Sequence, residues 1–285
     1  MELLALPHIG RFLRSAIAAI ALALPAAASA QGKLEAHYLV TLAGIPIGKG
    51  SWVIEINDTR YSAAASGVTT GLMHVLTEGE GTTAAHGTLS GGKVVSAIYA
   101  STIKSRNKAD EVRITLAKGN VTELKVDPPP DKDRERVPVT EEDRRGVYDP
   151  MTASLMPTPG GGDPVSAEAC QRTMPIFDGR MRYDLKLAYK RMETVKAEKG
   201  YAGPVVVCSV YFRPVGGYVP SRGAIRYLMK LRDMEIWLAP IAGTRVLVPF
   251  RAQGPTPIGE AVMQATQFIA TALPTRASAS GQRTP

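Results

Sequence analysis

The sequence is poor in the residues that most often carry out catalysis. It holds four histidines and two cysteines among 285 residues, and aromatic residues make up only 6%. It contains no Gly-x-Ser-x-Gly elbow, His-Glu-x-x-His zinc helix, phosphate-binding loop or dinucleotide fingerprint. The Ser-x-x-Lys match at 105–108 lies in a polar turn without the partner motifs of a penicillin-binding enzyme. We therefore predict no catalytic residues, no cofactor, no metal site and no enzymatic activity.

Long apolar runs are also absent, apart from one at the N-terminus. Arg11 and Arg14 precede the uncharged run 15–24, and Ala28, Ser29 and Ala30 supply the small residues of a cleavage site. The run is about 10–14 residues long, whereas a membrane-spanning helix needs about 20, so an uncleaved anchor is the weaker alternative.

These features predict a signal peptide over 1–30, cleaved after Ala30, and export to the periplasm. After cleavage we expect a β-rich domain over 31–275, a disordered tail over 276–285 and no transmembrane segment.

The charge is unbalanced toward the basic side. The formal net charge is +8, which would favour anionic lipid head groups or lipopolysaccharide phosphates as contacts. Ordinary solubility is the alternative explanation, and we favour it. Nucleic acid is not expected as a partner in an exported protein.

The two cysteines, Cys170 and Cys208, predict a disulfide, because an isolated pair in an oxidising compartment usually forms one. A redox pair and a metal site are the alternatives. The cysteines lack the C-x-x-C spacing of a redox pair. Neither cysteine has another metal-binding residue within a few positions, so a metal site is also disfavoured.

Short strands separated by turns dominate the rest of the pattern. Alternating apolar residues recur in 34–43, 51–56, 111–116 and 182–189, and a turn is expected over 44–48. A strand over 73–83 is less well marked. Asp178-Gly179 is a hairpin signal between 170–177 and 180–190. The spacing predicts an all-β fold, a single curved antiparallel sheet approaching a barrel or spiral, with one or two short helices.

The middle of the chain interrupts the strands. The segment 127–145 begins with the run of prolines 128–130 and continues with mixed charges, which predicts an exposed loop. Asp149 is a suitable cap for a short helix over 151–156, with Pro150 at its first position. The pattern of 224–232 fits a helix or a strand equally, and 258–270 favours a strand. A two-domain division near 157–164 is possible in principle, but we prefer one domain.

Aromatic residues and arginines gather in the second half of the sequence. A curved sheet with aromatic residues inside and arginines at its rim could hold an acyl chain and its anionic head. On this hypothesis Arg180, Tyr183 and Trp237 are the candidate ligand-binding residues. The simpler interpretation, which we favour, is that the aromatic rings fill the core and the arginines face solvent.

Several segments together resemble an exported bacterial family known as domain of unknown function 3108. The resemblance lies in their order and spacing: Tyr38 with Gly44 and Gly48, the stretch 148–155, the stretch 234–238, Val248-Pro249 and Gly259. It implies an antiparallel β architecture in the periplasm of a Gram-negative bacterium. It implies no established activity and no catalytic residues.

The expected function is therefore non-enzymatic support of the cell envelope, by binding a lipid-like ligand or another envelope protein. The alternatives are a periplasmic hydrolase or polysaccharide-processing enzyme, and a purely structural partner protein. The sequence specifies no oligomeric state.

Overall fold

The computed structural model describes residues 31–274, except 72–78, 91 and 107. The predicted signal peptide, the tail over 276–285 and most of the predicted strand 73–83 lie outside the described residues. The strands, in chain order, are β1 (Gly32–Leu42), β2 (Ile45–Ile56), β3 (Arg60–Thr69), β4 (Gly79–Ser90), β5 (Lys93–Ser105), β6 (Lys108–Ala117), β7 (Asn120–Asp127), β8 (Met156–Pro157), β9 (Thr173–Phe177), β10 (Arg182–Lys196), β11 (Lys199–Gly200), β12 (Ala202–Gly216), β13 (Glu235–Pro240), β14 (Val246–Thr256) and β15 (Gly259–Ala272).

Helical segments among the described residues are short. They are the 3-10 turns η1 (Glu142–Arg144) and η2 (Ala167–Cys170) and the α-helices α2 (Pro150–Ala153) and α3 (Gly223–Lys230). The ambiguous stretch 224–232 is thus mostly helical, and α3 buries none of its residues. The segment between β7 and α2 is a largely exposed loop, as predicted.

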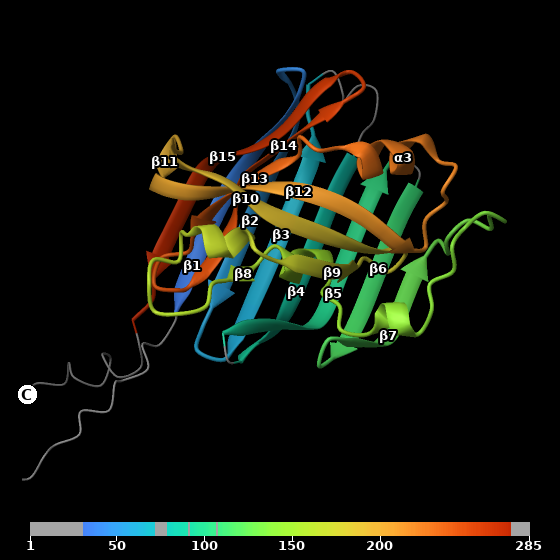
Figure 1. Ribbon diagram of the computed structural model, residues 1–285, viewed down its shortest axis with the longest axis horizontal. Helices are drawn as coiled ribbons and strands as arrows, with labels where there is room; N and C mark the ends of the chain where they lie inside the picture. The colour runs from blue at the N-terminus through green and yellow to red at the C-terminus, as the bar shows by residue number, and fades with distance from the viewer. Residues whose placement is uncertain (1–30, 72–78, 91, 107, 275–285) are drawn as a thin grey trace, which may run out of the picture.

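The strands form one antiparallel sheet that folds over on itself without closing into a barrel, which confirms the predicted fold class (Figure 1). The order along the sheet is β7-β6-β5-β4-β3-β2-β1-β15-β14-β13-β12-β10-β9. Strand β11 pairs in parallel with β15, and β8 pairs with β14. Because β1 pairs with β15 along its whole length, the first and last strands join two consecutive runs of strands into one sheet.

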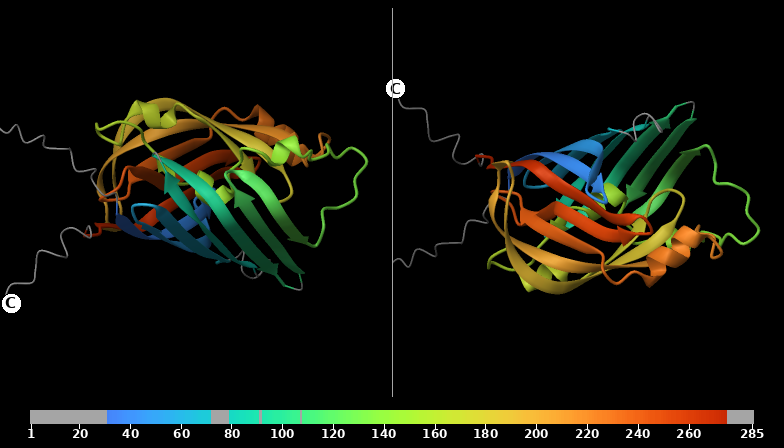
Figure 2. Two further views of the ribbon diagram at one scale, coloured as in Figure 1. Left: turned by 90° about the horizontal axis from the view of Figure 1, so that it is seen from below. Right: turned by 90° about the horizontal axis from the view of Figure 1, so that it is seen from above.

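The two halves of the sheet, β1–β7 and β9–β15, pack face to face around a shared core (Figure 2). Burial alternates along β1, where Leu34, Ala36 and Tyr38 point inward and Glu35 and His37 point outward. The short helix α2 lies between the two layers, where Met151 and Leu155 join the core.

A second apolar cluster lies outside the shared core, on the other side of the β9–β15 half. It contains Cys170, Val206, Leu238 and Leu247, together with Ala169 of η2. The Cys170–Cys208 disulfide lies in this cluster, with its Cα atoms 5.5 Å apart, and it confirms the predicted bridge. The bridge fastens the segment around η2 to β12.

The β9–β10 turn meets strands β6 and β7 at a seam, and Tyr148 pairs with Ile176 along the outer edge of β9. The turn at Asp178 and Gly179, predicted as a hairpin, joins β9 to β10 and packs against β6 and β7. Arg180 donates from Nη2 to Asp110 at 2.9 Å and from Nη1 to the carbonyl oxygen of Pro128 at 2.8 Å. The backbone N–H of Phe177 donates to the carbonyl oxygen of Tyr148 at 2.9 Å, so an isolated backbone bridge and the side chain of Arg180 together hold this edge.

Three local predictions were wrong. The short helix expected over 151–156 ends at Ala153, and Met156 begins β8. The turn expected over 44–48 is only the pair Ala43-Gly44, because both residues have positive φ angles (49° and 78°), as tight two-residue hairpins require. The strand expected over 170–177 begins only at Thr173, because Cys170 lies in η2, where it forms the disulfide.

Candidate functional site

A cavity of about 580 Å³ lies against the inner face of the first half of the sheet. Strands β1 to β5 form its floor and walls, and α2, β14 and β15 cover it. Lys49 and Val68 border the cavity, but they alternate with the inward positions of Gly50 and Gly67, so their exposed side chains lie on the outer face of the sheet. Lys49 is the only charged residue among the described residues that line it. The interior is predominantly apolar, with Val40, Ile47, Trp52, Tyr99, Met151 and Met263 among its lining residues.

The cavity exists because its floor lacks side chains. Gly50 of β2 pairs with Gly67 of β3, which in turn pairs with Gly81 of β4, so that three glycines lie side by side across the sheet. Gly50 and Gly67 both line the cavity. Each lies two residues from an inward-facing residue of its own strand, Trp52 and Ala65 respectively, and is therefore on the same inner face.

Gly67 in particular leaves usable space. A Cβ atom built on Gly67 would have its nearest neighbour, the carbonyl oxygen of Lys49, at 3.5 Å, which is ordinary contact. Its backbone does not have a positive φ angle. The backbone conformation at position 67 does not require glycine. The effect of having glycine there is that no side chain fills the floor of the cavity.

The cover of the cavity is tied to its wall by a buried hydrogen bond. The hydroxyl of Tyr38 donates to the carbonyl oxygen of Pro249 at 2.7 Å and joins β1 to β14 across the interior. Burial raises the pKa of the Tyr38 hydroxyl, so it stays protonated and remains a donor at neutral pH.

Trp52 is the unusual residue of the cavity wall. Only 7% of Trp52 is exposed, yet its indole Nε1–H has no hydrogen-bond partner among the described residues. A buried unpaired donor costs about 1–3 kcal/mol relative to a paired one. A ligand with an oxygen acceptor that reached this N–H would remove that cost.

A buried polar network holds α2 in place beneath the cover. The carboxylate of Asp149 accepts hydrogen bonds from the backbone N–H and the hydroxyl of Thr152, at 2.9 and 2.5 Å, which confirms the predicted helix cap. The Thr152 hydroxyl lies 2.5 Å from that of Tyr61 on β3, and the Ser96 hydroxyl of β5 accepts from the Asp149 N–H at 3.4 Å. Burial raises the pKa of Asp149, and these hydrogen bonds partly oppose that shift.

None of the three residues predicted to bind a ligand lines this cavity. Arg180 is engaged at the seam with Asp110. Tyr183 packs its ring on Phe212, with centroids 5.5 Å apart, and burial raises the pKa of its hydroxyl. Trp237 is buried elsewhere, so the structure does not bring the three residues together around one space. Their role in binding stays a prediction.

Trp237 belongs to a charged cluster. Its Nε1–H donates to Glu193 at 2.7 Å, and the guanidinium groups of Arg191 and Arg251 lie 5.4 and 4.9 Å from its ring centroid. The hydrogen bond from Trp237 is the main cause that lowers the pKa of Glu193. Glu235 pairs with Arg191 and with Lys190. The indole N–H and the ring of Trp237 are therefore already engaged by Glu193, Arg191 and Arg251.

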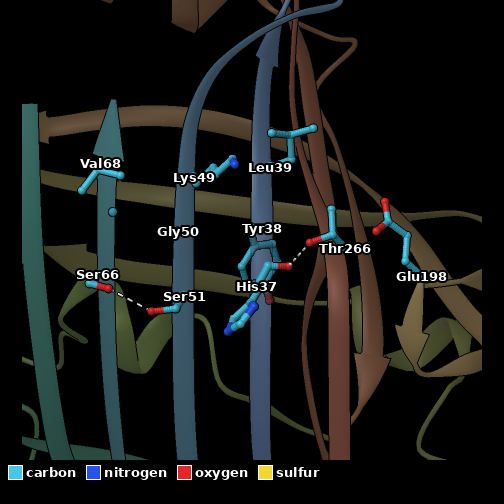
Figure 3. A pocket seen from close by; sticks show the side chains of 11 residues that line it. His37, Tyr38, Leu39, Lys49, Gly50, Ser51, Ser66, Val68, Glu198 and Thr266 are labelled. Atoms are coloured by element: carbon cyan, nitrogen blue, oxygen red, sulfur yellow. Dashed lines mark hydrogen bonds between the residues drawn. The ribbon is translucent and has the colours of Figure 1, made fainter. Parts of the chain in front are cut away.

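The outer face of the same sheet carries a second hollow, of about 640 Å³ (Figure 3). His37, Lys49 and Glu198 are its ionisable side chains, and the hydroxyls of Ser51 and Ser66 bond to each other at 2.8 Å. In Figure 3, Glu198 lies on the far side of Thr266 from His37. The three ionisable groups do not converge on one point. Within the described part of the chain, no three His, Cys, Asp or Glu side chains gather as metal ligands would.

The fold and the cavity together define an open, folded-over β-sheet protein with an apolar hollow between its layers. The chain belongs to the family described as "Protein of unknown function (DUF3108)", whose model matches residues 37–266, and this confirms the resemblance seen in the sequence. No curated protein matches the chain.

Among solved structures, the chain is similar to the crystal structure of a β-barrel-like protein of domain of unknown function DUF1849 from Brucella abortus. The two are 14% identical with a TM-score of 0.48, and the match covers 86% of this chain and 99% of that one.

The disulfide fits a compartment in which thiols oxidise. None of the helices formed by the described residues has the length and apolar character that crossing a bilayer requires.

Proposed function

We propose that this protein is an exported, non-enzymatic binding protein of the periplasm that holds one lipid-like molecule in the cavity between its two layers. The observation that carries the proposal is the glycine floor, because it leaves an apolar space of about 580 Å³ inside an otherwise packed core. Small-molecule sites are typically apolar hollows of roughly 300–1,000 Å³ with a few polar groups. The predicted signal peptide and the disulfide support the location.

The polar groups of the cavity suggest how such a ligand would lie. The apolar side chains Ile47, Met151 and Met263 would contact the acyl chain of the ligand. The unpaired N–H of Trp52 would donate to a carbonyl or ester oxygen once the ligand displaces the atoms that cover it. This pattern favours a fatty acid or acyl ester over a ligand with many polar groups.

The test uses a substitution that places a side chain on the floor of the cavity. The substitution Gly67→Val adds methyl groups to the open space and suits a strand, whereas Ala64→Val adds a similar volume on the exposed outer face of the same strand. The probe is N-phenyl-1-naphthylamine, an uncharged apolar dye whose emission rises on burial, followed by its displacement with oleic acid.

We expect wild type and Ala64→Val to bind the dye alike and to release it to oleic acid. Gly67→Val should lose at least tenfold in dye affinity while its thermal unfolding midpoint stays equal or rises. That combination separates a blocked cavity from a damaged fold. Unchanged dye binding by Gly67→Val, or no binding of dye or oleic acid by the wild type, would refute the proposal.

A further inference from the structure

A separate pocket of about 250 Å³ lies on the other side of α2 from the apolar cavity. Pro150, Met151 and Ser154 line the cavity, whereas Thr152 and Ala153 line this pocket, so the short helix stands between the two spaces. The rest of its lining comes from 92–94, 148, 155, 157, 159, 168 and 171–174. Its lining includes two cationic side chains, Arg172 and Lys93.

Arg172 is a partly buried cation without a counter-charge. Its Nη2 donates to the carbonyl oxygen of Pro157 at 3.0 Å, and its Nε is buried without any hydrogen-bond partner. Among the described residues, no carboxylate lies within 4.0 Å of its guanidinium group. Burial lowers the pKa of this group, although an arginine remains charged at neutral pH. A desolvated charge of this kind is costly unless an anion pairs with it.

Arg245 also donates to the segment that follows α2, but unlike Arg172 it has a hydrogen-bond acceptor for each of its three nitrogens. Its Nε, Nη1 and Nη2 donate to the carbonyl oxygens of Thr158, Gly162 and Pro159, at 3.1, 2.6 and 2.9 Å. Arg245 therefore fastens the segment 158–162 with all three nitrogens, whereas Arg172 makes one such bond and borders an open pocket. The contrast separates a structural arginine from one with spare donors.

The other polar groups of the pocket suit a small anion. Lys93 and Gln171 are exposed at its edge and can supply further donors. Glu168 is the one acidic residue among those that line it, and the pKa of its carboxyl is lowered chiefly by a hydrogen bond from Ser166. Its carboxylate is thus engaged away from Arg172, with which it forms no ion pair.

We propose that this pocket binds a single phosphate or carboxylate group, which pairs with the guanidinium of Arg172. The volume of about 250 Å³ is ample for such a group. The inference goes beyond the binding of a lipid-like molecule in the apolar cavity and does not depend on it, because α2 separates the two spaces.

The test compares Arg172→Met with Arg245→Met. Thermal unfolding is followed in inorganic phosphate, in acetate and in sn-glycerol 3-phosphate, against chloride at equal ionic strength. Wild type and Arg245→Met should gain about 3–6 °C at a tenfold excess of the anion over its dissociation constant, and Arg172→Met should gain nothing. Arg245→Met should start from a lower midpoint, because it loses three hydrogen bonds.

Arg172→Lys keeps the charge and serves as the second variant, with a reduced but measurable response. A response to sn-glycerol 3-phosphate alone would assign the site to a lipid head group, and a response to inorganic phosphate would assign it to the free anion. An unchanged response in Arg172→Met and Arg172→Lys, or no response of the wild type to any of the three anions, would overturn the proposal.

Discussion

The two halves of the sheet are built from the same kind of antiparallel strands, but different side chains line their inner faces. In the β9–β15 half, the rings of Tyr201, Phe250 and Phe268 pack on one another with centroids 5.6–6.3 Å apart. At the open end of the β1–β7 half, the corresponding inner face carries Gly50 and Gly67. Beside these two glycines the first half leaves the interior open, although elsewhere it fills the shared core with residues such as Tyr61 and Ile54.

The comparison shows that a cavity can be produced by what a strand omits. The β9–β15 half has a second core behind it, stapled by Cys170–Cys208, so it can serve as a rigid wall. The β1–β7 half has one packed face only, and its outer face is largely exposed. We therefore assign most of the stability to the second half and the binding space to the first.

We expect the largest change in the free energy of unfolding from removal of the disulfide in the second half. Replacing both cysteines, Cys170→Ala and Cys208→Ala, should destabilise the protein by about 4 kcal/mol, because the bridge closes a loop of 38 residues. Urea unfolding measures the loss. Below the unfolding transition, binding of N-phenyl-1-naphthylamine should be unchanged, and lost dye binding in the folded variant would break the division between the halves.

Two glycines provide the next comparison, with effects of opposite sign. Gly179→Ala should cost about 1–3 kcal/mol, because its φ angle is 97° and its Cβ would lie 2.5 Å from a methyl group of Val112. Gly67→Ala should instead stabilise by about 0.5–1 kcal/mol, because a strand glycine without a steric requirement is unfavourable. Equal losses in the two variants, measured by urea unfolding, would contradict the open floor.

The smallest expected effect concerns Asp149, where the two halves meet at α2. Because burial raises its pKa in the folded state above the ordinary value of 3.8, folding takes up a proton. The resulting stability is present below pH 3.8 and is lost as the pH rises through the folded pKa. Asp149→Asn keeps an oxygen for the Thr152 N–H but cannot ionise.

The free energy of unfolding at pH 4, relative to that at pH 7, should therefore be smaller in Asp149→Asn than in the wild type. Asp178, whose pKa burial also raises, is present in both proteins and cancels in the comparison. Parallel pH profiles of the two proteins would show that the carboxyl of Asp149 does not titrate in this range.

Much of the fold could be predicted from the sequence, because the signals were local. Alternation in β1, the Asp178-Gly179 hairpin, the Asp149 cap and the pairing of the two cysteines each depend on a few residues. The shortened turn at Ala43-Gly44 was missed because alanine rarely adopts a positive φ angle, so the sequence favoured the longer glycine-bounded turn.

The cavity could not be predicted in the same way. Gly50, Gly67 and Gly81 are far apart in the chain, and only the strand register brings them into one row. The aromatic and arginine content drew attention to the second half, although the space lies against the first. A weak signal was present, since a glycine inside a strand, as at Gly48-Lys49-Gly50 beside Trp52, often marks a close approach or a missing side chain.

The two tryptophans allow the central claim to be tested directly, because Trp52 lines the cavity and Trp237 does not. The measurement is quenching of tryptophan emission by a bromine-labelled fatty acid, which requires contact with the ring. In Trp237→Phe, which retains Trp52, we expect saturable quenching, and in Trp52→Phe, which retains Trp237, we expect almost none. Quenching of Trp237 alone, or of neither tryptophan, would contradict a ligand site on the glycine floor of the first half.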